Sequence, residues 1–174
     1  ATRRTVQTTP EGRQLLSRMD AKGRTVSARV GDLDSMIFTY DTRGRLEQQQ
    51  QGGRITSYAY HAANGRLKSV TDPLGQVTQF EYDSAGRVTR QTRPDSSAIL
   101  FAYDSSGNLT SLTPPGRPAH HFQYTPVDLT QRYDPPGIPD STPTGYFYNL
   151  DRQLDSIVRP NSITVLFKYD SAGR

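Results

Sequence analysis

Cysteine is absent from the 174-residue sequence, and this absence excludes several kinds of site at once. Without thiols the chain can form no disulfide bond, no thiol nucleophile and no cysteine-based zinc site. Long apolar runs are also missing: no stretch approaches the roughly 18 residues that a membrane-spanning helix needs. No signal peptide opens the sequence. The chain begins in a polar stretch and stops directly after a motif, so we expect a piece of a longer protein, truncated at both ends.

Charge of one sign is only weakly in excess. The 21 Arg and Lys residues against 17 Asp and Glu give a net charge of +4. A mild positive charge admits nucleic acid or an acidic polysaccharide as a partner. No dense block of Lys and Arg is present, however, and the basic residues are scattered along the chain. We therefore predict no nucleic-acid partner.

Residues suited to catalysis are scarce. The three histidines are His61, His120 and His121, and no acidic residues cluster with them in the sequence. A metal site or a general base needs such neighbours, so we predict structural placement for all three. The glycines lack the strand-to-helix context of a phosphate-binding loop. The sequence thus predicts no enzyme activity, no metal and no cofactor.

Apolar residues make up only 33% of the chain, which could indicate disorder. The spacing of the aromatic residues argues against it. Tyrosines recur every 20 to 24 residues, and another aromatic residue lies two positions before each. This set, which we call the aromatic ladder, comprises the pairs Phe38/Tyr40, Tyr58/Tyr60, Phe80/Tyr82, Phe101/Tyr103, Phe122/Tyr124, Tyr146/Tyr148 and Phe167/Tyr169. It contains fourteen of the sixteen aromatic residues, leaving out Tyr133 and Phe147.

The aromatic pairs predict β-strands. A third position, four residues before each ladder tyrosine, is mostly β-branched, as at Thr56, Thr78 and Val165. Aromatic and β-branched residues at every second position are typical of strands, and they place the three side chains on one face. The positions between them are more polar and suit the other face.

A turn motif follows the tyrosine. Asp stands first and Gly fourth in Asp41–Gly44, Asp83–Gly86, Asp104–Gly107 and Asp170–Gly173, and Gly65 closes a turn with one extra residue. Asp accepts nearby backbone N–H groups and Gly tolerates positive φ, so a type I turn with a bulge is predicted. Arg24, Arg45, Arg66 and Arg87 recur beside it. We expect them to bracket the turn by bonding to carboxylates or carbonyls.

Proline marks a second connection, nine residues before the ladder tyrosines. The residues are Pro10, Pro73, Pro94, Pro115, Pro139 and Pro160, with Met19 as a degenerate first tyrosine position. Proline cannot donate to a strand ladder and belongs between strands. Each period of about 21 residues is therefore two antiparallel strands. The Asp and Gly are lost after Tyr124, and a Pro-rich irregular connection is expected near 133–145. Only Glu11 to Ala21 could hold a short helical turn, and the repeat alignment predicts a strand there too.

The tandem motif Tyr-Asp-x-x-Gly-Arg-Leu/Val, with an aromatic residue two positions earlier, resembles the YD repeats of bacterial Rhs proteins. The stretches "TPEGR" and "TDPLG" are closer to Rhs proteins than to the animal teneurins, which share the repeat. About eight copies cover residues 1–174 as a single repeat array. The resemblance implies an all-β fold of tandem hairpins in a curved antiparallel sheet, part of a hollow shell.

The resemblance also implies a function. In Rhs proteins the shell encloses a toxic C-terminal domain, which a secretion system or toxin complex delivers from the cell. The expected partners are the rest of the shell, the enclosed toxin and the delivery machinery. Family members also carry a self-cleavage motif of the type Asp-Pro-x-Gly-Leu. The sequences after Asp72 and Asp134 differ from it in their context, so we interpret the chain as an internal, non-catalytic segment of the shell.

Carbohydrate binding or adhesion is the alternative function. Repeated Tyr, Phe and Arg residues could stack on sugar rings, and exposure of the ladder would discriminate between the two functions. In the shell interpretation each ladder residue would pack against its equivalent in the next repeat. The isolated segment would then present open edge strands, through which we expect self-association.

Overall fold

The computed structural model describes residues 3–137, 143–170 and 172–174. These residues are almost entirely β-strands and tight turns. The chain divides into two units, Ala1–Phe80 and Glu81–Arg174, and each is described by itself.

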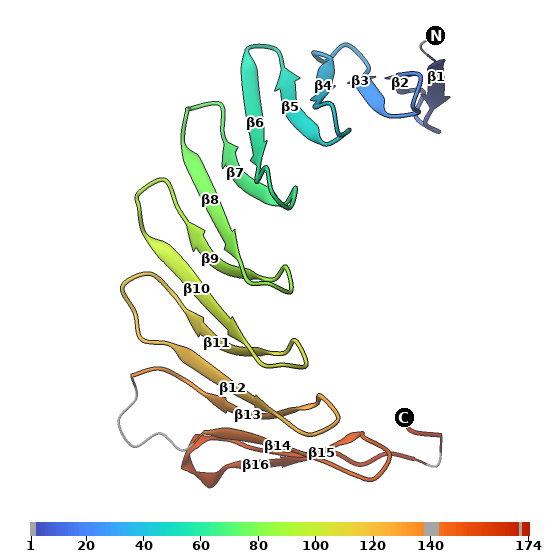
Figure 1. Ribbon diagram of the computed structural model, residues 1–174. Helices are drawn as coiled ribbons and strands as arrows, with labels where there is room; N and C mark the ends of the chain where they lie inside the picture. The colour runs from blue at the N-terminus through green and yellow to red at the C-terminus, as the bar shows by residue number, and fades with distance from the viewer. Residues whose placement is uncertain (1–2, 138–142, 171) are drawn as a thin grey trace. The chain divides into compact units, whose positions relative to one another are not determined.

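The first unit is an antiparallel meander. Its strands are β1 (Arg3–Thr8), β2 (Gln14–Met19), β3 (Thr25–Val30), β4 (Met36–Tyr40), β5 (Leu46–Gln51), β6 (Arg54–Tyr60), β7 (Leu67–Thr71) and β8 (Val77–Tyr82), whose last two residues belong to the second unit. Each strand pairs with the next one along the chain. Successive hairpins therefore lie side by side in sequence order (Figure 1).

The second unit repeats this arrangement. Its strands are β9 (Val88–Thr92), β10 (Ala98–Tyr103), β11 (Leu109–Thr113), β12 (His120–Tyr124), β13 (Thr130–Asp134), β14 (Thr144–Tyr148), β15 (Leu154–Val158) and β16 (Thr164–Leu166), with a 3-10 turn η1 (Pro160–Ser162) before the last. All pairs are antiparallel and join consecutive strands. The predicted all-β fold of tandem hairpins is confirmed.

The Asp-x-x-Gly turns have the predicted geometry. In the turn between β4 and β5, the Gly44 N–H donates to the Asp41 carbonyl at 2.9 Å, and the Asp41 N–H donates to the Arg45 carbonyl at 2.9 Å. Gly44 has φ of +85°, and the strand register shifts between Thr39 and Tyr40. The motif thus closes each hairpin through a type I turn and a bulge.

The same turn also forms where the motif has been lost. After Tyr124, the Thr125 hydroxyl accepts the Leu129 N–H at 3.1 Å, and Asp128 takes the glycine position with φ of +61°. After Tyr148, Asn149 takes the place of the aspartate and Arg152 the place of the glycine, with φ of +62°. Strand pairing on both sides therefore holds the turn even with residues that tolerate positive φ less well.

Two expectations about the strands need correction or fall outside the described residues. β16 ends at Leu166, so Phe167 and Tyr169 do not continue a strand as predicted, although the Phe167 N–H still donates to the Asp155 carbonyl at 2.9 Å. β16 pairs with β15 alone, and a strand bonded on one side ends sooner. The expected irregular connection falls largely on residues 138–142, including Pro139, which lie outside the described residues. The stretch Glu11 to Ala21 contains β2, which confirms the strand that the repeat alignment predicted there; no helical turn forms in it.

The sheet has no buried apolar core. Among the described residues, no apolar side chain is buried, and Ser156, at 9% exposure, is the one buried polar residue. A single sheet layer covers neither of its own faces, and stable domains pack at least two layers. The ladder side chains are therefore half-buried, except for the exposed Tyr169, whereas the sequence predicted a packed aromatic face.

Candidate functional site

The residues of the repeat meet in a contact set that recurs along the sheet. It joins the turn aspartate, the arginine four residues later and the next ladder tyrosine, and we call it the turn cluster. Three turn clusters are described: Asp20–Arg24–Tyr40, Asp41–Arg45–Tyr60 and Asp83–Arg87–Tyr103. In each, the tyrosine belongs to the following hairpin, so the cluster connects neighbouring repeats.

The aspartate organises its own turn. One oxygen of Asp41 accepts the backbone N–H groups of Arg43 and Arg45, both at 2.9 Å. Its second oxygen accepts Arg45 Nε at 2.7 Å, and Arg45 Nη2 lies 2.6 Å away. This fork fixes the guanidinium plane, which explains why arginine rather than lysine recurs here.

The arginine covers the tyrosine of the next hairpin. Arg45 Cζ lies 4.3 Å from the centroid of the Tyr60 ring, and the corresponding distances are 4.5 Å in the first cluster and 4.7 Å in the third. Arg45 Nη1 also donates to the Gly65 carbonyl at 3.2 Å. The predicted bonding of these arginines to carboxylates or carbonyls is confirmed at Arg24, at Arg45 and at Arg87, whose Nη1 donates to the Asp104 carbonyl at 2.8 Å.

The tyrosine hydroxyl makes a contact that sequence reasoning missed. Tyr60 Oη donates to the Leu46 carbonyl at 2.7 Å. Five more ladder tyrosines repeat the bond, in the pairs Tyr40–Thr25, Tyr103–Val88, Tyr124–Leu109, Tyr148–Thr130 and Tyr169–Leu154, at 2.7 to 3.0 Å. The signal was the preference for Tyr over Phe at the second aromatic position: only Tyr can donate such a bond.

Ladder residues of successive repeats do not lie on adjacent strands. The strands that carry the ladder, such as β4 and β6, are separated by one return strand, so their backbones are about 10 Å apart. The first aromatic of each pair instead faces a residue of the return strand: Tyr58 lies opposite Val70, and Phe101 opposite Leu112. Phe122 faces Tyr133 with ring centroids 5.3 Å apart. Phe38 faces Gln49, and Tyr146 faces Ile157.

The turn aspartates have lowered pKa values. For Asp41 the hydrogen bond from the Arg45 backbone N–H is the main cause of the lower pKa, and the Arg45 side chain adds to it against the opposing effect of burial. The pKa of Asp83 is lowered in the same way by Arg87. The pKa of Tyr60 is raised, chiefly because burial disfavours the phenolate.

These shifts predict loss of stability in acid. A carboxyl whose pKa is lower in the folded than in the unfolded chain stabilises the fold above the unfolded value of about 3.8, and that contribution is lost as the pH falls below it. The melting temperature should therefore fall between about pH 5 and pH 2. Asp41→Asn should weaken this dependence, whereas Asp32→Asn, at an exposed loop residue outside the turn clusters, should keep it. Identical pH profiles for D41N and wild type would contradict the role of the cluster.

The remaining candidate residues have structural contacts. His120 Nδ1 lies 2.8 Å from Tyr133 Oη, His61 Nε2 lies 3.4 Å from the Phe80 carbonyl oxygen, and His121 is exposed. Asp72 accepts two N–H groups of its own turn, and Asp134 is paired with Arg132. Within the described ranges, no group of three metal-ligating side chains gathers. The described part of the chain also has no helix of the length and apolarity that crossing a membrane requires.

The family model for the teneurin YD-shell matches residues 1–174. The chain belongs to the teneurin YD-shell family. The resemblance to YD-repeat proteins drawn from the motif is thereby confirmed, and membership of a shell family favours a structural over a catalytic role. No curated protein matches this YD-shell chain by sequence.

Solved toxin-complex structures share the fold. A TcdB2-TccC3-Cdc42 structure and a TcdB2-TccC3 structure without its hypervariable C-terminal region each match 94% of the chain at a TM-score of 0.74 and 16% identity. The Tc holotoxin pore of Photorhabdus luminescens matches 91% at a TM-score of 0.70 and 16% identity. In all three the match spans 10% of the solved chain. At this identity the likeness concerns the fold.

Proposed function

We propose that this chain is a wall segment of a YD-repeat shell that encloses and protects a C-terminal toxin or effector domain for delivery, without catalysis of its own. The observation that carries the proposal is the turn cluster, which repeats one contact set from hairpin to hairpin. Its residues bind one another and the backbone of their own sheet. The structural neighbours are components of toxin complexes, which supports the same function and a secreted or delivered parent protein assembled with other components.

Glycan binding receives less support from the ladder. Its tyrosine hydroxyls donate to carbonyls, and the arginines cover three of the rings. The exposed aromatic residues are Phe147, at 53% and outside the ladder, and Tyr169, at 38%. An open row of rings, which sugar stacking along the repeats would need, is not present in the described residues. Binding of glycans through the ladder stays an untested alternative.

Limited proteolysis of the full-length protein that contains this segment tests the proposal. We expect a protected fragment from beyond the repeats, identified by mass spectrometry. A Tyr60→Ala/Tyr103→Ala variant should lose this protection, because it breaks two clusters in the wall. Leu74→Ser is the matched control, since Leu74 is 82% exposed in a turn. Free digestion of the downstream region while the repeats persist would contradict enclosure.

A further inference from the structure

Positive charge is concentrated at the start of the chain. Residues 1–30 contain seven of the 21 basic residues but only two of the 17 acidic ones, so they carry a net charge of +5, whereas residues 31–174 carry −1. The basic residues are Arg3, Arg4, Arg13, Arg18, Lys22, Arg24 and Arg29. One of the two acidic residues, Asp20, is already paired with Arg24. The excess charge lies on β1–β3 and their turns.

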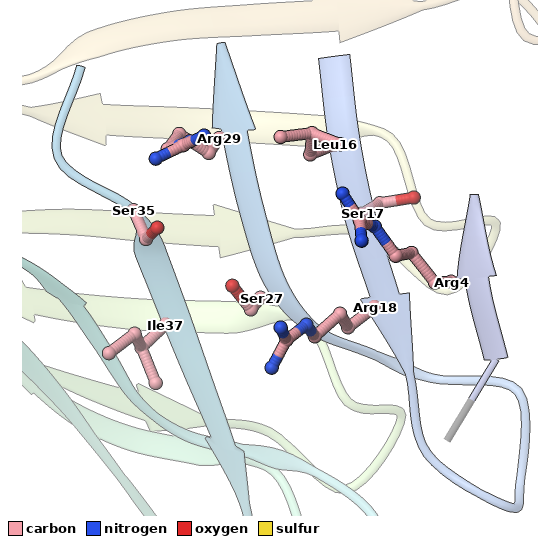
Figure 2. Close-up of a pocket in the computed structure, with 8 residues that line it drawn as sticks. All are labelled: Arg4, Leu16, Ser17, Arg18, Ser27, Arg29, Ser35 and Ile37. Atoms are coloured by element: carbon pink, nitrogen blue, oxygen red, sulfur yellow. The ribbon is translucent and has the colours of Figure 1, made fainter. Parts of the chain in front are cut away.

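Strand register brings three of these arginines onto one face. Arg4 of β1 lies directly opposite Arg18 of β2, and Arg29 of β3 lies opposite Leu16, two residues from Arg18 on the same face. These side chains line one groove of about 450 Å³ together with Ser27 and Ile37. Figure 2 shows how they lie on β1, β2 and β3. Neighbouring strands are about 4.8 Å apart and alternate residues about 6.7 Å. The three arginines therefore form a row in which Arg4 lies directly across from Arg18, and Arg29 lies diagonally from Arg18.

The three guanidinium groups have no ion-pair partner among the described residues. In the part of the chain that the structure describes, no ion pair or hydrogen bond engages the side chains of Arg4, Arg18 or Arg29, and all three residues are exposed. Like charges directly opposite each other destabilise an antiparallel pair. The arginines of the turn clusters, in contrast, each have a carboxylate. Positively charged side chains that lie together, although their repulsion destabilises the sheet, indicate a site for an anionic ligand.

The shape of the groove favours a peptide. An extended polypeptide presents alternate side chains about 6.7 Å apart, which lies between the spacings of the arginine row, about 5 Å from Arg4 to Arg18 and about 8 Å from Arg18 to Arg29. Guanidinium groups bind carboxylates through paired hydrogen bonds, and Leu16 and Ile37, the latter 44% exposed, offer apolar contacts between them. The ladder residues Phe38 and Tyr40 alternate onto the other face of β4, so the groove has no ring on which a base could stack.

We infer that this groove is a binding site for an acidic, extended polypeptide segment with carboxylates at alternating positions. Arg18 and Arg29 are the central contacts and Arg4 extends the row. The inference does not require that the sheet encloses a toxin, because the groove would bind a partner on either side of the shell wall. Failure of the binding experiment would therefore leave the proposed shell function standing.

Fluorescence anisotropy with the full 174-residue chain tests the inference. The probe is a labelled peptide of alternating glutamate and valine, and the comparison ligand is its glutamine–valine analogue. We expect salt-sensitive binding of the glutamate peptide alone. Arg18→Gln/Arg29→Gln should weaken it at least about tenfold. The matched control, Arg3→Gln/Arg13→Gln, removes the same charge outside the groove and should change binding by less than about twofold.

Three other outcomes of the binding experiment would overturn the inference. Equal binding of the glutamine peptide would indicate pairing with an edge strand, and equal loss in both double variants would indicate non-specific charge attraction. Tighter groove-dependent binding of a sulfated oligosaccharide or an oligothymidylate would assign the site to that class instead. R18Q/R29Q should melt no lower than wild type, because it removes repulsion. If R18Q/R29Q melts below wild type, the variant Arg18→Lys/Arg29→Lys provides the test. It keeps the positive charge but cannot form the paired hydrogen bonds of a guanidinium group with a carboxylate, so an unchanged affinity for the glutamate peptide would contradict the site.

Discussion

Tyr103→Ala is expected to lower the free energy of unfolding by about 2 kcal/mol. The substitution removes a half-buried ring, its contact with the Arg87 guanidinium at 4.7 Å, and the hydroxyl that donates to the Val88 carbonyl at 3.0 Å. A fully buried ring would cost about 3 kcal/mol or more. The expected loss of unfolding free energy is smaller here because the ring is half-exposed in the single-layer sheet, so less of its area is removed from water on folding.

Two companion variants separate the contributions in denaturant unfolding. Tyr103→Phe keeps the ring and removes only the hydrogen bond, so we expect a loss of about 1 kcal/mol. Phe147→Ala removes an exposed ring from the other face of β14 and should cost less than Tyr103→Ala. If Tyr103→Ala unfolds at the wild-type denaturant concentration, the ladder does not hold the sheet together.

Gly44→Val is expected to cost about 2 to 3 kcal/mol. Gly44 has φ of +85°, which a β-branched residue adopts only under strain. A Cβ at this position would also lie 3.2 Å from Arg24 Nη1, which is buried and has no hydrogen-bond partner. The substitution therefore strains the turn and displaces the arginine of the first cluster. Thermal melting of the full chain measures both effects together.

Gly53→Val provides the control for this prediction. Gly53 lies in the turn between β5 and β6, its φ is outside the left-handed region, and a Cβ there would meet nothing within 4 Å. We expect a change within about 0.5 kcal/mol. Comparable losses at both positions would show that any side chain harms these turns, and would contradict the requirement for positive φ at Gly44.

The local features of this protein were determined by the sequence alone. Aromatic residues at alternate positions specify a strand within five residues, and Asp followed by Gly specifies the turn within four. Both depend on neighbours along the chain, so the period of about 21 residues, the antiparallel hairpins and the bonding of Arg45 could be predicted. The YD-repeat motif also sufficed to identify the family. The strand predicted at Phe167 and Tyr169 was wrong, because a strand also needs partners across the sheet.

Only the tertiary structure decided which residues of different strands meet. Tyr60 reaches back to the Leu46 carbonyl, and Arg45 covers its ring, because the bulge and the register bring β6 beside the preceding turn. The same register turned Arg4, Arg18 and Arg29, scattered in the sequence, into one cationic groove. A shift of one residue would send each of these side chains to the other face, since strand side chains alternate. Cross-strand contacts therefore depend on register, which no single repeat contains.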